Sequence, residues 1–103
     1  MPIMEISIVP VGTSTASVSS YVRDAVKILK DEKNIKHELT SMGTIIEADS
    51  VEELLSLANK MHNIILKGDV QRVVTSIKID DRRDKKLKME EKIKSVNLKL
   101  MEE

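Results

Sequence analysis

The side chains best suited to chemistry lie in and after one strand-like stretch, residues 72–84. Its first half alternates Val73, Thr75, Ile77 and Ile79 with a second set that includes Ser76, Lys78 and Asp80, so one face is apolar and the other is polar. Five consecutive charged residues, 80–84, follow. A small core does not accept unpaired charges, so these side chains are either solvated or used.

Three further groups of polar residues can converge with Lys78 and Asp80 at one end or face of a sheet. They are the hydroxyl-rich loop 13–20, the turn at residues 42–44, and Glu47. Together they offer hydroxyl groups, two carboxylates and a thioether, a set that suits a cationic or amidine-like heterocycle better than a phosphate. Ion pairs at a subunit interface explain Glu47, Lys78 and Asp80 equally well.

Several kinds of chemistry find no support in the sequence. The chain has no cysteine, which excludes disulfides, thiolate metal sites and thiol nucleophiles. His37 and His62 match no metal-ligand spacing, so we expect no metal site. The loop 13–20 has no histidine near it and no Gly-x-Ser-x-Gly elbow, and helix capping explains most of its hydroxyl groups. We therefore predict no catalytic residue and no enzyme.

The charge and composition of the chain indicate which classes of partner it can bind. The chain carries 17 basic and 17 acidic residues and only 1% aromatic residues. Proteins that bind RNA on an open sheet stack bases on aromatic side chains, which this sheet lacks, and a solvated helix explains the basic residues of 82–94. We therefore expect no nucleic acid as partner. We also expect no membrane as partner, because no apolar run approaches the roughly 20 residues of a spanning helix. A cytoplasmic location is the expectation.

The remaining elements follow from hydrophobic periodicity and capping signals. We predict strands over 3–11, 72–80 and, as a hairpin, 36–49 with its turn at Met42-Gly43. One helix should be capped by Ser14, Thr15 or Ser17 and fade near Asn34. A second should be capped by Asp49 or Ser50 and stop at Lys67-Gly68. The last should be capped by Asp84 and carry an apolar stripe of Met89, Ile93, Val96 and Leu100.

This order predicts an α+β fold, a single ferredoxin-like βαββαβ domain over residues 1–103 with a four-stranded antiparallel sheet and an extra C-terminal helix. Both crossover helices would cover one face of the sheet. The residues left on the other face would be Glu5, Ser7, Val9, Val74, Ser76, Lys78 and Asp80. A bare sheet face that contains valines usually meets another copy of the same chain.

Four stretches also carry a family pattern: residues 11–22, residues 41–47, Met61-His62 with residues 68–73, and residues 77–84, the last being the most specific. Over nearly its whole length the chain resembles the small thiamine-binding protein family, which is related to YkoF-like proteins. Two positions depart from that pattern: Ala48 replaces the usual Gly and Asn63 the usual Glu. The methyl group of Ala48 narrows a place where a ligand or another backbone comes close.

The resemblance implies a homotetramer built as a dimer of dimers, no catalysis and no cofactor, with thiamine or its hydroxymethylpyrimidine moiety as the ligand. It assigns ligand binding to Thr13, Ser17, Ser19, Met42, Gly43, Thr44, Glu47, Lys78 and Asp80, and Tyr21, His62 and Arg82 also match its motifs. Glu47 can accept a hydrogen bond from the pyrimidine amino group, and Asp80 can balance the thiazolium charge. The alternative is a structural or regulatory oligomer whose charged motif serves subunit assembly or binds another effector.

Overall fold

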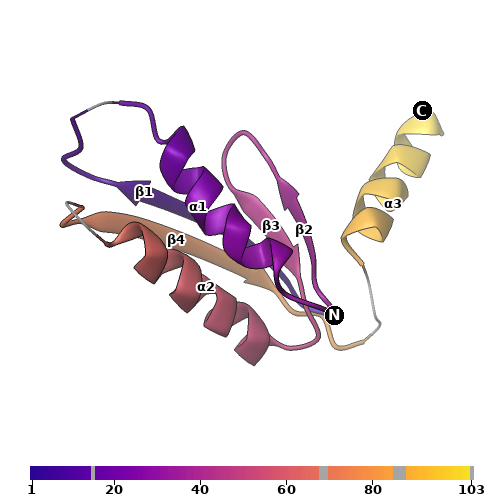
Figure 1. Cartoon of the computed structure of the whole chain (residues 1–103). Helices are drawn as coiled ribbons and strands as arrows, with labels where there is room; N and C mark the ends of the chain where they lie inside the picture. Colours follow the sequence, from indigo (N-terminus) through magenta and orange to yellow (C-terminus); the bar gives the residue numbers. More distant parts are fainter. Residues whose placement is uncertain (15, 68–69, 85–87, 103) are drawn as a thin grey trace.

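The computed structural model describes residues 1–14, 16–67, 70–84 and 88–102. It confirms the predicted α+β fold, with a four-stranded antiparallel sheet in the order β2-β3-β1-β4 (Figure 1). The elements in chain order are β1 (Ile3–Pro10), α1 (Ser19–Lys30), β2 (Lys36–Leu39), β3 (Thr44–Glu47), α2 (Val51–Ile65), β4 (Val73–Asp80) and α3 (Met89–Met101).

Strand β1 is central to the sheet, and its two neighbours differ in length. It pairs with β4 over all eight of its residues, from Ile3 opposite Asp80 to Pro10 opposite Val73. It pairs with β3 only from Ile3 opposite Glu47 to Ile6 opposite Thr44. The second half of β1 therefore extends beyond the β2–β3 hairpin.

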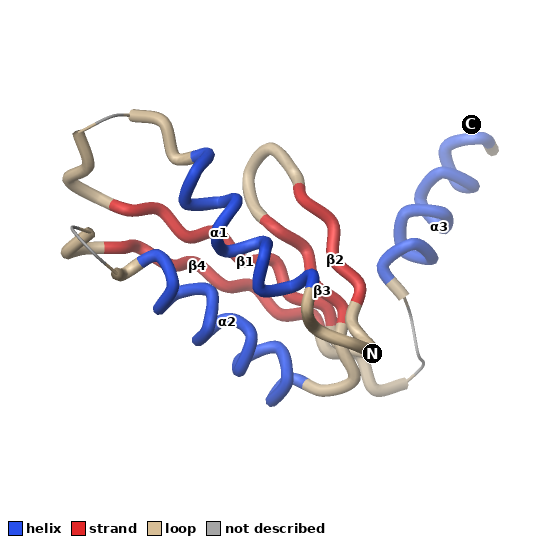
Figure 2. Tube along the Cα trace, viewed as in Figure 1, coloured by secondary structure: helices blue, strands red, loops and turns tan. Residues whose placement is uncertain are grey.

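Helices α1 and α2 both cover the same face of the sheet, as Figures 1 and 2 show. Because side chains alternate along a strand, that face takes every second residue of β1, and these residues are buried as predicted. The core consists of Met4, Ile6, Ile8, Ala25, Leu29, Ile46, Ala48, Leu54, Leu57, Ala58, Met61 and Ile65. Aliphatic and methionine side chains thus build the core in place of aromatic ones.

The β2–β3 hairpin turns through residues 40–43, and Thr40 organises it. Its backbone N–H donates to the carbonyl of Gly43 at 2.8 Å, and its hydroxyl donates to the same carbonyl at 2.9 Å. The backbone N–H groups of Met42 and Gly43 donate in turn to the Thr40 hydroxyl. The turn is held against β1, because a Cβ atom at position 43 would lie 2.9 Å from the carbonyl oxygen of Ile6.

We predict that Gly43→Ala destabilises the protein by about 1–3 kcal/mol, because the added methyl group meets backbone that cannot rotate aside. Chemical denaturation followed by circular dichroism measures the change. Ser41→Ala, at an exposed position in the same turn, is the control and should change the unfolding free energy by less than about 0.5 kcal/mol. Equal stability of the two variants would contradict the close approach.

Several predicted helix ends differ from the structure. Helix α1 begins at Ser19 after Val18, whose position has no side-chain cap, so the predicted caps Ser14 and Ser17 are wrong; Thr15 lies outside the described residues. The helix ends at Lys30 rather than near Asn34, which adopts a left-handed φ of 65°. Asparagine tolerates that conformation better than most residues, because its short polar side chain bonds locally.

The ends of α2 follow the sequence more closely. The Ser50 hydroxyl accepts a hydrogen bond from the backbone N–H of Glu53 at 3.1 Å, which confirms the predicted cap. The helix ends at Ile65, two residues before the predicted stop at Lys67-Gly68, of which Gly68 lies outside the described residues.

Helix α3 begins at Met89, five residues after the predicted cap, Asp84. That prediction is wrong because Asp84 instead binds Arg82 in the segment before the helix. The helix stands apart from α1 and α2 (Figure 1), and the chain as a whole measures 50 Å along its longest axis. Most of its residues are exposed; Met89 is its buried residue.

Candidate functional site

The short β2–β3 hairpin leaves a hollow beside the second half of β1, which we call the hairpin cleft. It is a cavity of about 260 Å³ between the sheet, the turn at residues 40–43 and the helices. Its lining residues are Ile6, Ser7, Ile8, Val9, Val18, Val22, Ala25, Leu39, Thr40, Ser41, Met42, Gly43, Thr44, Met61 and Ile65. Three of the predicted ligand-binding residues, Met42, Gly43 and Thr44, therefore lie in it.

The hairpin cleft is mainly apolar, with hydroxyl groups from the turn. Thr40, Ser41 and Thr44 supply these hydroxyls, and Met42 is 82% exposed within the same turn. Ser17 and Ser19, whose hydroxyl oxygens are 3.3 Å apart, line an adjoining groove that shares Val18, Val22, Leu39 and Thr40 with the cleft. The cleft and groove thus gather five of the predicted residues on the helix side of the sheet.

Glu47 lies elsewhere, on the opposite face of the sheet. It is 1% exposed, and neither of its carboxylate oxygens has a hydrogen-bond partner among the described residues. It sits in the sheet between Ile3 of β1 and Lys36 of β2. A cavity of about 340 Å³, the Glu47 niche, is lined by Met1, Asn34, Ile35, Lys36, Glu47, Asp49 and Lys88.

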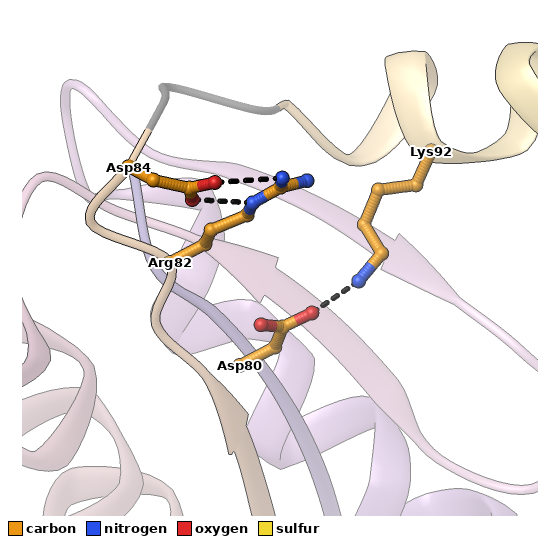
Figure 3. Close-up of polar contacts among 4 residues, drawn as sticks. All are labelled: Asp80, Arg82, Asp84 and Lys92. Carbon is orange, nitrogen blue, oxygen red and sulfur yellow. Dashed lines mark hydrogen bonds and ion pairs between the residues drawn. The ribbon is translucent and has the colours of Figure 1, made fainter.

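Two ion pairs hold the start of α3 over this end of the sheet. Lys36 of β2 donates to Glu90 at 2.9 Å, and Lys92 donates to Asp80 at the end of β4 (Figure 3). The hydrogen bond from Lys92, and then its charge, lower the pKa of Asp80. Lys36 lowers the pKa of Glu90 in the same way, and Glu90 raises the pKa of Lys36.

The charged motif after β4 is likewise engaged within the chain. The guanidinium of Arg82 makes a two-point contact with Asp84, with N–O distances of 2.5 and 2.8 Å (Figure 3). This contact, by its hydrogen bond first and its charge second, raises the pKa of Arg82. Asp80 and Arg82 are therefore both engaged by side chains of this chain, and together with Ile3 and Lys92 they line a further cavity of about 280 Å³.

The remaining predicted ligand-binding residues are Lys78 and Thr13. Lys78 lies exposed on the open face of β4, opposite Glu5 of β1. Thr13 lies in the loop after β1 and lines neither the hairpin cleft nor the Glu47 niche. Within a single chain the predicted ligand-binding residues do not gather in one pocket, because alternation along β3 sends Thr44 to one face of the sheet and Glu47 to the other.

His62 has a structural contact. Its Nδ1 atom lies 2.7 Å from the Thr75 hydroxyl, which ties α2 to β4. Within residues 1–14, 16–67, 70–84 and 88–102, no group of three or more His, Asp or Glu side chains is placed to hold a metal ion. In the same part of the chain, no helix has the length and hydropathy to cross a membrane.

Comparison with known proteins identifies the family. The family model described as thiamine-binding protein matches residues 4–97 of this chain. The chain belongs to the thiamine-binding protein family. A curated relative, the UPF0045 protein YqgV of Bacillus subtilis, is 45% identical over 100 residues, covering 94% of this chain and 95% of that protein. A UPF0045 protein of Methanothermobacter thermautotrophicus is 40% identical, with 93% and 96% covered.

Solved structures of similar proteins have the same fold as this member of the thiamine-binding protein family. The hypothetical protein MJ1052 of Methanocaldococcus jannaschii matches with a TM-score of 0.84 and 41% identity, covering 93% of this chain and 95% of that one. A Thermotoga maritima protein, TM0486, matches with a TM-score of 0.74 at 18% identity, covering 92% and 97%, which shows the fold alone. The family resemblance of the sequence is therefore confirmed.

Sequence reasoning missed three parts of the site. It named Glu47 but not its burial, it did not expect Lys92 to pair with Asp80, and it omitted Val18 and Val22 from the cleft. The apolar spacing of α1 already contained Val18 and Val22, but that signal indicates a core face as readily as a cleft wall. The exposed Lys92 gave no signal, since its partner is 12 positions away in sequence.

The ion pairs predict how the docking of α3 depends on pH. Because the pKa values of Asp80 and Glu90 are lowered from 3.8 and 4.5, their contribution is complete above those values and is lost as the pH falls through the lowered ones. Lys36 has a pKa raised from 10.5, so its contribution is lost as the pH rises through the raised value. Acidification from pH 4.5 through these lowered pKa values should therefore release α3 progressively while the core persists.

Methyl NMR of Met89, the buried residue of α3, measures this release against the core signal of Met61. Lys92→Met is the matched variant and should undock α3 more readily at neutral pH, by a small amount because the pair is exposed and screened by solvent. If the Met89 signal is unchanged by both acid and the substitution, the ion pairs do not dock the helix.

Proposed function

We propose that this protein is a cytoplasmic homotetramer, a dimer of dimers, that binds thiamine or its hydroxymethylpyrimidine moiety without catalysing a reaction. The proposal rests on membership of the thiamine-binding protein family, whose model covers residues 4–97. The Thermotoga maritima neighbour is named as a candidate protein of thiamine biosynthesis or salvage, which agrees with this ligand class.

The observation that carries the proposal is the composition of the hairpin cleft. Its volume of about 260 Å³ is of the size of a single heterocycle with substituents, and its floor is apolar. A methyl-substituted pyrimidine offers an apolar ring for Ile8, Val22 and Met61, and polar edges for the hydroxyls of Thr40 and Ser41. Met42 supplies the soft contact with the ring that an aromatic residue supplies in other sites.

Isothermal titration calorimetry with thiamine and with hydroxymethylpyrimidine tests the proposal. We expect saturable binding of at least one of them, weakened about two- to tenfold by Met42→Ala, because a sulfur–ring contact contributes about 0.3–1.5 kcal/mol. Met42 is 82% exposed, so the substitution should leave stability unchanged. Met101→Ala, at an equally exposed methionine on α3, is the control and should bind as the wild type does.

Two results would contradict this account in different ways. No heat with either ligand at millimolar concentration would remove the ligand assignment. Binding that Met42→Ala and Met101→Ala leave equally unchanged would keep the ligand but remove the hairpin cleft as its site.

A second candidate function is a structural or regulatory oligomer, and the contacts of Asp80 and Arg82 favour it. Both belong to the charged motif, and both bind side chains of this chain, Lys92 and Asp84. On this account the motif positions α3, whose exposed Ile93, Val96 and Leu100 form an apolar stripe for assembly. The two candidate functions therefore differ in the role of the charged motif, which either binds the ligand or serves subunit assembly.

The double substitution of Lys78 and Asp80 by Ala separates the two candidates. If the motif serves assembly, size-exclusion chromatography should show smaller particles while the calorimetric response to thiamine stays unchanged. If the motif binds ligand, the affinity should fall while the particle size is retained. Lys33→Ala, at an exposed lysine after α1, controls for a general effect of charge.

A further inference from the structure

Strand β2 forms one of the two edges of the sheet, and half of its backbone groups face outward (Figure 1). The backbone N–H of Thr40 donates to the carbonyl of Gly43, so the backbone groups of Thr40 face β3. Because this direction alternates along a strand, the N–H and C=O groups of His37 and Leu39 point to the free side of β2. The edge therefore offers two donors and two acceptors to a further strand.

Helix α1 and strand β2 form a groove at this edge, next to the hairpin cleft, which we call the edge groove. It measures about 620 Å³ and is lined by Ser17, Val18, Ser19, Val22, Arg23, Val26, Lys27, Lys30, Leu39 and Thr40. Leu39 lies on the helix side of the sheet, as its partner Thr44 does, and is 56% exposed. Edge strands are commonly protected by charged side chains rather than by an exposed leucine. The edge groove therefore combines a free strand edge with uncovered apolar area.

The charged residues among the described lining of the edge groove are all basic. Arg23, Lys27 and Lys30 recur at helical spacing on the side of α1 that lines the groove. Arg23 contacts Asp24 at 3.1 Å, but Lys27 and Lys30 have no acidic partner among the residues that the structure describes. In a chain with 17 basic and 17 acidic residues, this arrangement concentrates positive charge beside a free strand edge. The edge groove therefore favours an anionic occupant.

We infer that the edge groove is a docking site for an acidic peptide segment of a partner protein, which adds to the sheet as a further strand beside β2. The peptide backbone pairs with His37 and Leu39, and every second side chain is directed toward α1. Carboxylates at these positions are about 6.8 Å apart, and successive basic residues of α1 are separated by a rise of about 4.5–6 Å, so the two series can pair. An aliphatic residue in the same series covers Leu39.

Two-dimensional amide NMR of the wild-type protein with a synthetic peptide tests the inference. The probe is an acetylated and amidated heptapeptide in which threonine and glutamate alternate. We expect saturable shifts centred on the amide signals of His37 and Leu39, and slower hydrogen exchange of both groups in the presence of the peptide. The same peptide with lysine in place of glutamate is the control and should cause neither effect.

Two N-methylated peptides test whether the backbone pairs. In an antiparallel pair with β2 the N–H groups of the glutamates face the strand, and in a parallel pair those of the threonines do. Methylation of one set should therefore abolish binding at millimolar peptide, whereas methylation of the other set should leave most of it. An equal effect of the two methylations would overturn the strand addition, because the groove would then take polyanions without regard to their backbone.

Charge reversal tests the contact with α1. Lys27→Glu should weaken binding of the acidic peptide roughly fivefold or more, because it replaces an attraction by a repulsion. The lysine peptide should bind this variant better than it binds the wild type. Lys67→Glu, at an exposed lysine after α2, is the matched control and should bind the acidic peptide as the wild type does. Equal binding by the two variants would show that α1 does not contact the peptide, and would overturn the inference.

Two further results would overturn the inference. One is the absence of any shift at β2 with millimolar acidic peptide. The other is slow hydrogen exchange of His37 and Leu39 in the protein alone, which would show that a second copy of the chain already occupies this edge. The peptides contain no heterocycle, and the calorimetry with thiamine contains no peptide, so this inference and the proposed function can each fail without the other.

Discussion

The structure depends on the packing of both crossover helices against one face of a four-stranded sheet. All the strand residues of the aliphatic core lie on that face. A chain of this size can bury only one such core, so its apolar area has to be buried in one place. Among the residues that the structure describes, the start of α3 lies over the other face, through Met89 and two exposed ion pairs. Val9 and Val74 remain 44% and 48% exposed there, beside Ser76, Lys78 and Glu5. A half-apolar face of this kind is typical of a surface that a second copy covers.

Strand β3 shows how the fold positions two different environments with very few residues. It has four residues, Thr44–Glu47, and alternation directs Thr44 and Ile46 to the helices and Ile45 and Glu47 to the open face. The same strand therefore forms part of the hairpin cleft and the floor of the Glu47 niche. The short length of β3 is equally important, because β3 begins only at Thr44, opposite Ile6, while β1 continues to Pro10 and so leaves room for the cleft.

The sequence was sufficient to predict the fold, because alternation along the strands and helical periodicity identify most of the core residues. Met4, Ile6 and Ile8 were identified by alternation, and Ser50 by its position before an acidic first turn. Helix ends were less predictable: Asp84 and Ser17 have the chemistry of caps, but Asp84 binds Arg82, and α1 begins two residues beyond Ser17. The sequence could not show that the predicted ligand-binding residues lie in separate places, because spacing along a chain does not reveal on which side of a sheet separate loops meet. The orphaned state of Glu47 depends on where Lys36 points, which only three-dimensional packing decides.

The central claim is that the open face of the sheet is closed by further copies of this chain. Sedimentation velocity of the wild-type protein at micromolar concentration tests it directly, because the mass of a single chain is 11.6 kDa. The account predicts one species with the mass of a tetramer, or of a dimer in equilibrium with it. A stable, monodisperse species of 11.6 kDa under these conditions would contradict it.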